Sequence, residues 1–170
     1  MSNRPWIRAA MLAGRDALII AATAYTWMHW GPTRADPGLA VSGGLAVLTV
    51  LCGYLIHEWG HLAGAVAARA SFVLAPTPWA SPFLFRFDAR GNSREQFAAM
   101  SAGGFISSAV LVALLLATLP LHALAGQLSI GLVVIGVIAT IVLEVPEFLR
   151  VWRGQPIPTT AAYFSSDHSE

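Results

Sequence analysis

Residues 51–66 carry the sequence LCGYLIHEWGHLAGAV, which places an H-E-x-x-H motif inside a long apolar stretch. In a helix, a spacing of four residues puts His57 and His61 on one face, so both imidazoles can reach a single metal ion. Glu58 lies beside them, where a carboxylate can act as a general base on a water molecule. The apolar flanks predict that this metal-binding helix lies within a lipid bilayer.

The composition is that of an integral membrane protein. The chain is 56% hydrophobic and 11% charged, with a mean hydropathy of +0.63, whereas soluble domains carry about 25% charged residues. A net charge of +1 argues against a nucleic-acid-binding surface. The single cysteine, Cys52, excludes an internal disulfide. The H-E-x-x-H motif in such a chain therefore predicts a hydrolysis reaction within the membrane.

The distribution of apolar residues predicts an all-α polytopic protein that forms a single membrane domain over residues 1–170. Transmembrane helices are expected at about residues 17–30, 39–68, 97–119 and 128–150, followed by a polar tail at residues 154–170. The first is expected to be a retained span and not a cleaved signal peptide, because Arg15 and Asp16 interrupt the apolar stretch that follows the basic start and no small-residue cleavage site closes it. Pro120 and Gly126 predict a break between the last two spans.

A short β-hairpin-like loop, associated with the membrane, is expected between the second and third spans. Phe83, Phe85 and Phe87 alternate with other residues in a period of two, which indicates a strand, and residues 72–74 are its expected partner. A strand edge beside a metal site can pair with an extended peptide, so these three phenylalanines are candidate substrate-binding residues. The alternative is that the hairpin only anchors the chain at the interface. Residues 93–96 predict a capping box that opens the third span.

A catalytic zinc normally takes three ligands from the protein, so the two histidines need a partner. Glu144 and Glu147 are the best candidates, because they lie at a depth in the fourth span comparable to that of the motif in the second. Ionisable residues within a span are costly and usually face a partner or a cavity. The alternative is that they pair with Arg150 or Arg153 at the interface.

The arginines predict the orientation. All ten basic residues are arginine: three precede the first span, four lie between the second and third, and two follow the fourth. These three segments lie on one side of the membrane if every span crosses it, and only Arg34 lies on the opposite side. By the positive-inside rule both termini are expected in the cytoplasm, as in a protein of the bacterial inner (plasma) membrane.

With these features the chain resembles the site-2 protease family of intramembrane zinc metallopeptidases, over about residues 39–153. The hairpin loop takes the place of that family's membrane-associated β-hairpin. Residues 101–107 resemble its Gly-Pro-x-x-Asn signature, with Gly103 matching, Gly104 in place of the proline and Ser107 in place of the asparagine. The family's last core helix carries Asn-x-x-Pro and then Leu-Asp-Gly, of which this chain keeps Pro146.

The resemblance implies a zinc-dependent endopeptidase that cleaves a membrane-spanning segment of another protein. Glu58 would be the general base, and His57 and His61 would bind Zn²⁺ with Glu144 or Glu147 in place of the family's aspartate. The altered second and third motifs favour an alternative, a non-catalytic membrane subunit or scaffold of a larger complex. A metal transporter ranks last, because the third span offers only serine and threonine as polar residues.

Overall fold

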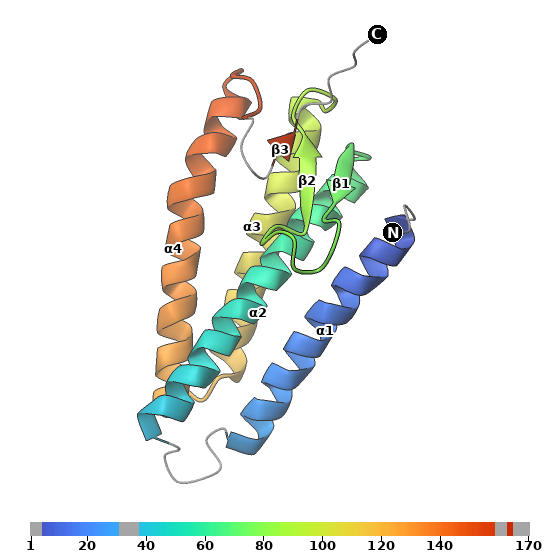
Figure 1. Cartoon of the computed structure of the whole chain (residues 1–170). Coiled ribbons are helices and arrows are strands. Elements are labelled where there is room, and N and C mark those ends of the chain that lie inside the picture. Colours follow the sequence, from blue (N-terminus) through green and yellow to red (C-terminus); the bar gives the residue numbers. More distant parts are fainter. Residues whose placement is uncertain (1–4, 31–37, 159–162, 165–170) are drawn as a thin grey trace.

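Four long helices dominate the structure, a computed structural model that describes residues 5–30, 38–158 and 163–164. The helices are α1 (Pro5–Trp30), α2 (Gly38–Ala67), α3 (Arg94–Thr118) and α4 (Leu124–Trp152). Helices α2, α3 and α4 pack against one another, and α1 lies along α2 (Figure 1). The prediction of a mainly helical protein is therefore confirmed.

Three of these helices are long and apolar enough to cross a membrane. They are α2, α3 and α4, with mean hydropathies of 2.1, 2.0 and 2.6, and they match the spans predicted at residues 39–68, 97–119 and 128–150. Helix α1 begins at Pro5, well before the predicted residue 17, and so includes Arg8, Arg15 and Asp16. Among the described residues, length and composition thus indicate three spans, and they do not show the fourth span that was expected in α1.

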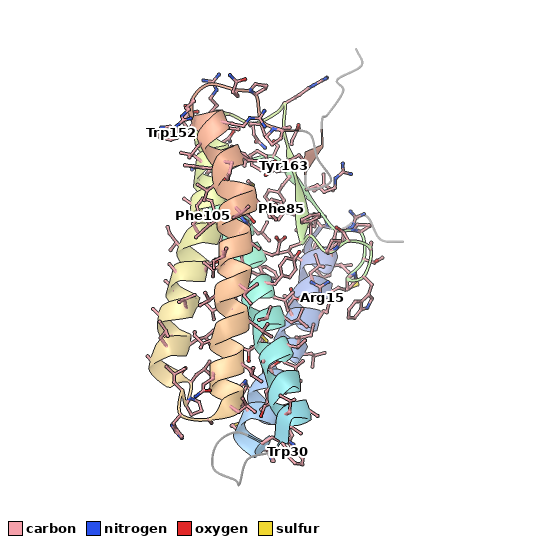
Figure 2. The ribbon with its side chains drawn as sticks, turned by 90° about the vertical axis from the view of Figure 1, so that its left-hand side faces the viewer. Arg15, Trp30, Phe85, Phe105, Trp152 and Tyr163 are labelled. Atoms are coloured by element: carbon pink, nitrogen blue, oxygen red, sulfur yellow. The ribbon has the colours of Figure 1, made fainter. Side chains whose placement is uncertain are left out.

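The apolar side chains of these three helices largely face outward. Only 28%, 17% and 11% of the most apolar windows of α2, α3 and α4 are buried inside the protein. Side chains project from the helices along their length (Figure 2), and the exposed large ones include Val110, Leu114, Ile135, Ile138, Val142 and Leu143. An exposed apolar surface of this kind is unfavourable in water, and it indicates contact with lipid.

Helices α2 and α3 approach each other closely through glycines. Gly60 and Gly64 of α2 face Gly103 of α3, and a Cβ atom on Gly103 would meet the backbone of both. Small residues at such positions allow close backbone packing between membrane helices. The contact brings the backbone of α3 directly beside the H-E-x-x-H motif.

Polar caps fix where α2 ends and α3 begins. Arg69, two residues after the end of α2, has a positive φ of 54°, the left-handed conformation that commonly follows a helix. The predicted capping box is present, since Ser93 Oγ accepts from the Gln96 N–H and Gln96 Oε1 accepts from the Ser93 N–H. Gln96 Nε2 also donates to the carbonyls of Ala68 and Arg69, which ties the two helix ends together.

A small sheet covers one end of the helices. Strands β1 (Phe72–Leu74) and β2 (Phe85–Asp88) pair antiparallel, with Phe72 opposite Phe87 and Leu74 opposite Phe85. The predicted hairpin is confirmed, although β2 begins at Phe85 and not at Phe83. Strand β3 (Tyr163–Phe164) pairs parallel with the other side of β2, where the sequence predicted only a polar tail.

The buried core lies where this sheet meets the helices. It draws on α1, α2, β2, α3, α4 and the residues next to the hairpin strands, and it consists of Leu12, Leu62, Ala65, Ala75, Leu84, Phe85, Phe87, Phe97, Met100 and Val151. The sheet is therefore packed against the part of α2 that follows the motif, and β2 is held at a fixed place beside it.

Gly103→Ala tests the close contact of α2 with α3. The added methyl would meet backbone that cannot rotate away, so we expect a loss of about 1–3 kcal/mol of stability, measured by thermal unfolding in detergent. Gly131→Ala is the matched control on α4, because a Cβ there meets nothing within 4 Å and alanine favours a helix. Equal stability of the two variants would contradict the packing described.

Candidate metal centre

The two histidines of the motif point the same way from consecutive turns of α2. His57 Nε2 and His61 Nε2 lie 2.9 Å apart, and both side chains are largely buried, with 8% and 12% exposed. The spacing of four residues produces this arrangement, because residues i and i+4 share a helix face. The predicted pairing of the two imidazoles is present in the structure.

Glu144 of α4 reaches the same point. Its Oε1 lies 3.1 Å from His57 Nε2 and its Oε2 lies 3.2 Å from His61 Nε2. Each residue offers one ligand atom to a group whose atoms all lie within 4.8 Å of one another, so the three could hold a metal ion. Glu147 lies outside this group and lines the adjacent cavity. Of the two candidate glutamates, Glu144 is the one brought to the histidines.

Helix α3 orients both imidazoles through their other ring nitrogens. His57 Nδ1 lies 3.0 Å from the Gly104 carbonyl and 2.9 Å from Ser108 Oγ, and His61 Nδ1 lies 3.0 Å from the Met100 carbonyl. A carbonyl only accepts hydrogen bonds, so each Nδ1 carries a proton and donates it. In the neutral form of each ring, Nε2 then has a lone pair, and this is the tautomer that binds a metal through Nε2.

The charges at this point call for a cation. Two nitrogen lone pairs and a carboxylate lie within 4.8 Å of one another, and they repel one another unless a positive charge lies between them. A metal ion or a proton on one ring supplies that charge. Because both Nδ1 atoms already carry protons and all three ligand atoms converge, the donor set fits a divalent metal with two imidazoles and one carboxylate.

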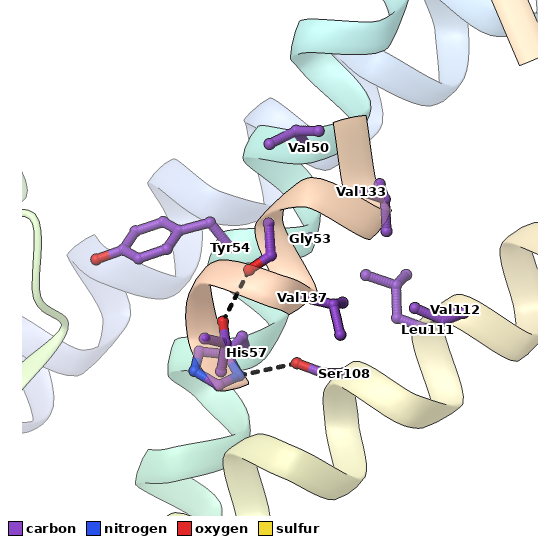
Figure 3. Close-up of a pocket in the computed structure, with 11 residues that line it drawn as sticks. Val50, Gly53, Tyr54, His57, Ser108, Leu111, Val112, Val133 and Val137 are labelled. Carbon is purple, nitrogen blue, oxygen red and sulfur yellow. Dashed lines mark hydrogen bonds between the residues drawn. The ribbon is translucent and has the colours of Figure 1, made fainter. Parts of the chain in front are cut away.

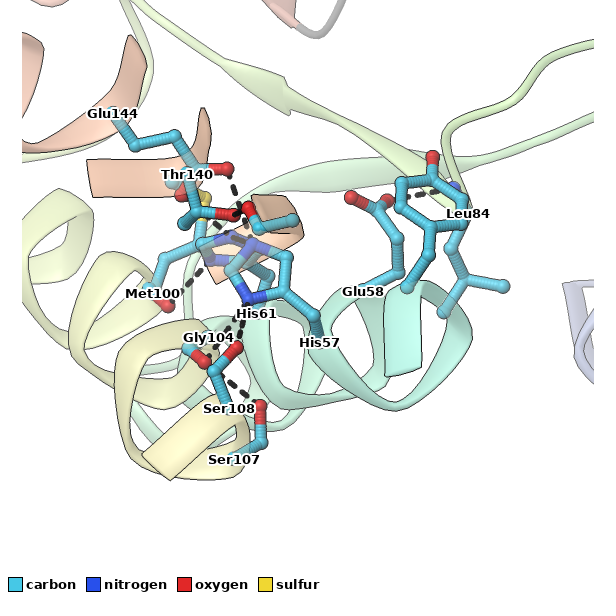
Figure 4. Close-up of polar contacts among 12 residues, drawn as sticks. His57, Glu58, His61, Leu84, Met100, Gly104, Ser107, Ser108, Thr140 and Glu144 are labelled. Carbon is cyan, nitrogen blue, oxygen red and sulfur yellow. Dashed lines mark hydrogen bonds and ion pairs between the residues drawn. The ribbon is translucent and has the colours of Figure 1, made fainter. Parts of the chain in front are cut away.

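Glu58 occupies the other side of the motif, toward the sheet (Figure 4). It is 9% exposed, and its Oε2 accepts a hydrogen bond of 3.1 Å from the Leu84 N–H. Leu84 directly precedes β2, so the loop before the strand positions this carboxylate. Glu58 thus lies between the candidate metal ligands and the sheet, as a general base must if a peptide is to bind along β2.

A cavity of about 290 Å³ joins these groups. Glu58, His61 and Glu144 all line it, together with the three predicted substrate-binding residues Phe83, Phe85 and Phe87, and its remaining lining residues are Phe97, Met100, Ser101, Leu143, Glu147 and Tyr163. The cavity therefore has a polar part at the motif and an aromatic wall at the sheet.

A second cavity, of about 200 Å³, lies on the opposite side of His57 between α2, α3 and α4 (Figure 3). Its lining is mainly apolar and includes Val50, Leu111, Val133 and Val137. The candidate metal ligands are thus flanked by an aromatic cavity near the sheet and an aliphatic one deeper among the helices.

A buried aspartate ties the motif to α1. Asp16 is 2% exposed, and its carboxylate accepts from Trp59 Nε1 at 2.8 Å and from Arg15 Nε at 2.6 Å. Arg15 also donates to the Pro78 carbonyl, and its guanidinium lies 5.7 Å from the Trp79 ring. In the sequence, Arg15 and Asp16 only interrupt an apolar stretch, whereas in the structure they link α1, the motif and the loop before β2.

Several contributors to the site were not predicted from the sequence. Ser108 and the carbonyls of Met100 and Gly104 hold the imidazoles, and a Cβ on Gly104 would meet the His61 ring. Ser107 donates to the Gly104 carbonyl at 2.8 Å. The one signal in the sequence is their spacing of four residues in α3, which places Met100, Gly104 and Ser108 on one face of that helix.

No protein-family model, curated protein or solved structure matches the chain. The interpretation of the site therefore rests on its residues and their geometry.

Glu144→Ala and Glu147→Ala separate the two glutamates. Removing Glu144 takes away one of the three ligand atoms, so we expect bound metal to fall from about one ion per chain to near zero. Glu147→Ala should keep the metal, because Glu147 lies outside the group. Metal content of the purified variants, measured by mass spectrometry without chelator, checks this; loss of metal in Glu147→Ala alone would contradict the ligand set.

Ser108→Ala tests the orientation of His57. The variant removes one of two acceptors for the Nδ1 proton, and we expect metal affinity to fall about tenfold; the Gly104 carbonyl keeps the loss at the low end of the usual range. Competition with a chromophoric chelator measures the affinity. Thr118→Ala is the matched control, since that hydroxyl lies on the same helix and bonds to the Leu114 carbonyl, away from the imidazoles, and an equal loss in both variants would argue against a specific role for Ser108.

Proposed function

We propose that the chain is an intramembrane zinc metallopeptidase, similar to site-2 proteases, that cleaves a membrane-spanning segment of another protein. The observation that supports this most strongly is the shared cavity. Glu58 and two candidate metal ligands, His61 and Glu144, open on one space. A carboxylate base and a metal site that face the same volume form the arrangement that metal-assisted hydrolysis requires.

The donor set supports zinc as the metal. Two imidazoles and one carboxylate are the protein ligands of many zinc peptidases, which leave a fourth position for water or substrate. When bound, zinc would polarise both a water molecule and the scissile carbonyl. The protonated Nδ1 atoms of His57 and His61 hold the two rings in the ligating tautomer.

Glu58 moves the proton in this proposal. Its carboxylate accepts a proton from a water molecule in the cavity, and the water oxygen forms a bond to the peptide carbonyl carbon. The same carboxyl group then donates that proton to the amide nitrogen as the carbon–nitrogen bond breaks, which releases an amine and a carboxylic acid that loses its remaining proton to water. The Leu84 N–H, which bonds to Glu58 Oε2, orients the carboxylate during both transfers.

The sheet supports the choice of substrate. The peptide bonds of a transmembrane helix are hydrogen-bonded and covered by side chains, so a helix must unwind before it can be cut. Strand β2 can hold such a segment in extended form by main-chain pairing. Phe83, Phe85 and Phe87 give the cavity an aromatic wall, which suits the apolar side chains of a membrane segment.

In this proposal α1 crosses the membrane as a fourth span. Its Arg15 and Asp16 pair with each other, which lowers the cost of placing them near the bilayer. The start of α1, the sheet and the end of α4 lie toward the same end of the molecule (Figure 1). That end carries most of the arginines and would face the cytoplasm of a bacterial inner membrane.

Glu58→Gln tests the mechanism. The amide keeps the size of the side chain but cannot accept the proton, so we expect cleavage to fall about 10²–10⁴-fold while metal content stays unchanged. Cleavage is measured by mass spectrometry on single-span model proteins reconstituted with the enzyme in liposomes. Glu95→Gln is the matched control, because Glu95 is exposed at the start of α3.

Two outcomes would redirect the interpretation. Retained cleavage in Glu58→Gln would exclude Glu58 as the base. A wild-type chain that is free of metal and inactive on every model protein would favour the non-catalytic subunit or scaffold, for which the altered motifs around Gly104 and Pro146 already argue.

A further inference from the structure

The C-terminal segment returns to the sheet after α4 ends. Tyr163 and Phe164 form β3, which runs parallel to β2 with Tyr163 opposite Phe87 and Phe164 opposite Asp88. Strand β1 pairs with the opposite side of β2, so β3 takes the side that β1 leaves available. In Figure 1 this short strand lies between β2 and α4.

The Tyr163 side chain is held in an aromatic recess. Its ring centroid lies 6.4 Å from that of Phe87 and 6.1 Å from that of Phe97, separations at which aromatic pairs are favourable. The Tyr163 carbonyl accepts a hydrogen bond of 3.2 Å from the Arg86 side chain. Burial, followed by the nearby Glu147 carboxylate, raises the pKa of the Tyr163 phenol above its usual value.

Tyr163 also lines the cavity that contains Glu58, His61 and Glu144. A segment of the chain itself therefore lies along β2, in extended form, with an aromatic side chain facing the candidate catalytic groups. These are the features that the proposed function requires of a bound substrate segment.

We propose that β3 occupies a peptide-docking site formed by the edge of β2 and the recess of Phe87 and Phe97, so that the C-terminal segment competes with the substrate. The identity of the competing peptide rests on the proposed function, whereas the site rests on the contacts of Tyr163. The expected ligand is an extended segment that runs parallel to β2 and places an aromatic side chain in the recess.

The competition is expected to be reversible because the contact is small. Strand β3 pairs with only two residues of β2, and main-chain pairing can be supplied by any sequence. However, β3 belongs to the same chain as the site, so its effective concentration there is about millimolar. A weak internal contact can therefore hold the site until a better-fitting segment arrives.

A labelled peptide measures this competition directly. The probe is a fluorescein-labelled peptide of residues 155–170, added to the full chain in detergent and followed by anisotropy. Tyr163→Ala removes the internal aromatic side chain, and we expect this variant to bind the peptide at least about tenfold more tightly than the wild type. Tyr25→Ala is the matched control, because Tyr25 is 58% exposed on α1 and should leave binding at the wild-type level.

Two further variants show that the aromatic ring is responsible. A chain with Tyr163→Phe keeps the ring and should bind the peptide as weakly as the wild type. A peptide in which its own tyrosine is replaced by alanine should not compete in any background. Equal affinity of the wild-type and Tyr163→Ala chains, or binding that does not depend on the peptide's tyrosine, would overturn the proposal.

A second measurement avoids any folding defect of Tyr163→Ala. A photoreactive benzoylphenylalanine placed at position 163 should crosslink within residues 83–100, and excess peptide should suppress that product. A crosslink elsewhere, or one that excess peptide leaves unchanged, would overturn the docking site. Because neither readout requires cleavage, an active protease without peptide competition would refute only this proposal, and peptide competition without cleavage would refute only the proposed protease.

Discussion

The convergence of His57, His61 and Glu144 among apolar helices is the constraint on which the rest of the structure depends. Each of these groups is costly in a membrane interior when it has no partner. Their ligand atoms meet within 4.8 Å, so one cation held between them would compensate all three. That meeting fixes the distance between α2 and α4, and it requires α3 to approach closely enough to orient the rings.

Packing and chemistry are therefore coupled in α3. The glycine contact of Gly103 with Gly60 and Gly64 sets the separation of α2 and α3, and this separation brings the Met100 and Gly104 carbonyls to 3.0 Å from the imidazoles. Larger side chains at the contact would move those carbonyls away from the two Nδ1 atoms, and the rings would no longer be held in the tautomer that binds a metal. Small residues in α3 thus serve ligand orientation as much as helix association.

Local patterns predicted the parts of the site that lie within one element. The spacing of His57 and His61, the capping box and the alternation of Phe85 and Phe87 each reflect the geometry of a single helix or strand. Depth in the fourth span indicated Glu144 and Glu147 as candidates but did not choose between them. Ser108 and the pairing of β3 depend on contacts between elements far apart in the sequence. No local pattern encodes those contacts, because many serines and tyrosines occupy similar positions without a partner.

The link from Asp16 to Trp59 explains how a charged first helix supports the site. Trp59 stands between Glu58 and His61 in the motif, and its indole N–H is bonded to a carboxylate that also pairs with Arg15. Arg15 in turn holds the loop at Pro78, and this loop leads to Leu84, whose N–H orients Glu58. The same α1 side chains thus constrain Glu58 from both directions, through the helix that carries it and through the loop that binds it.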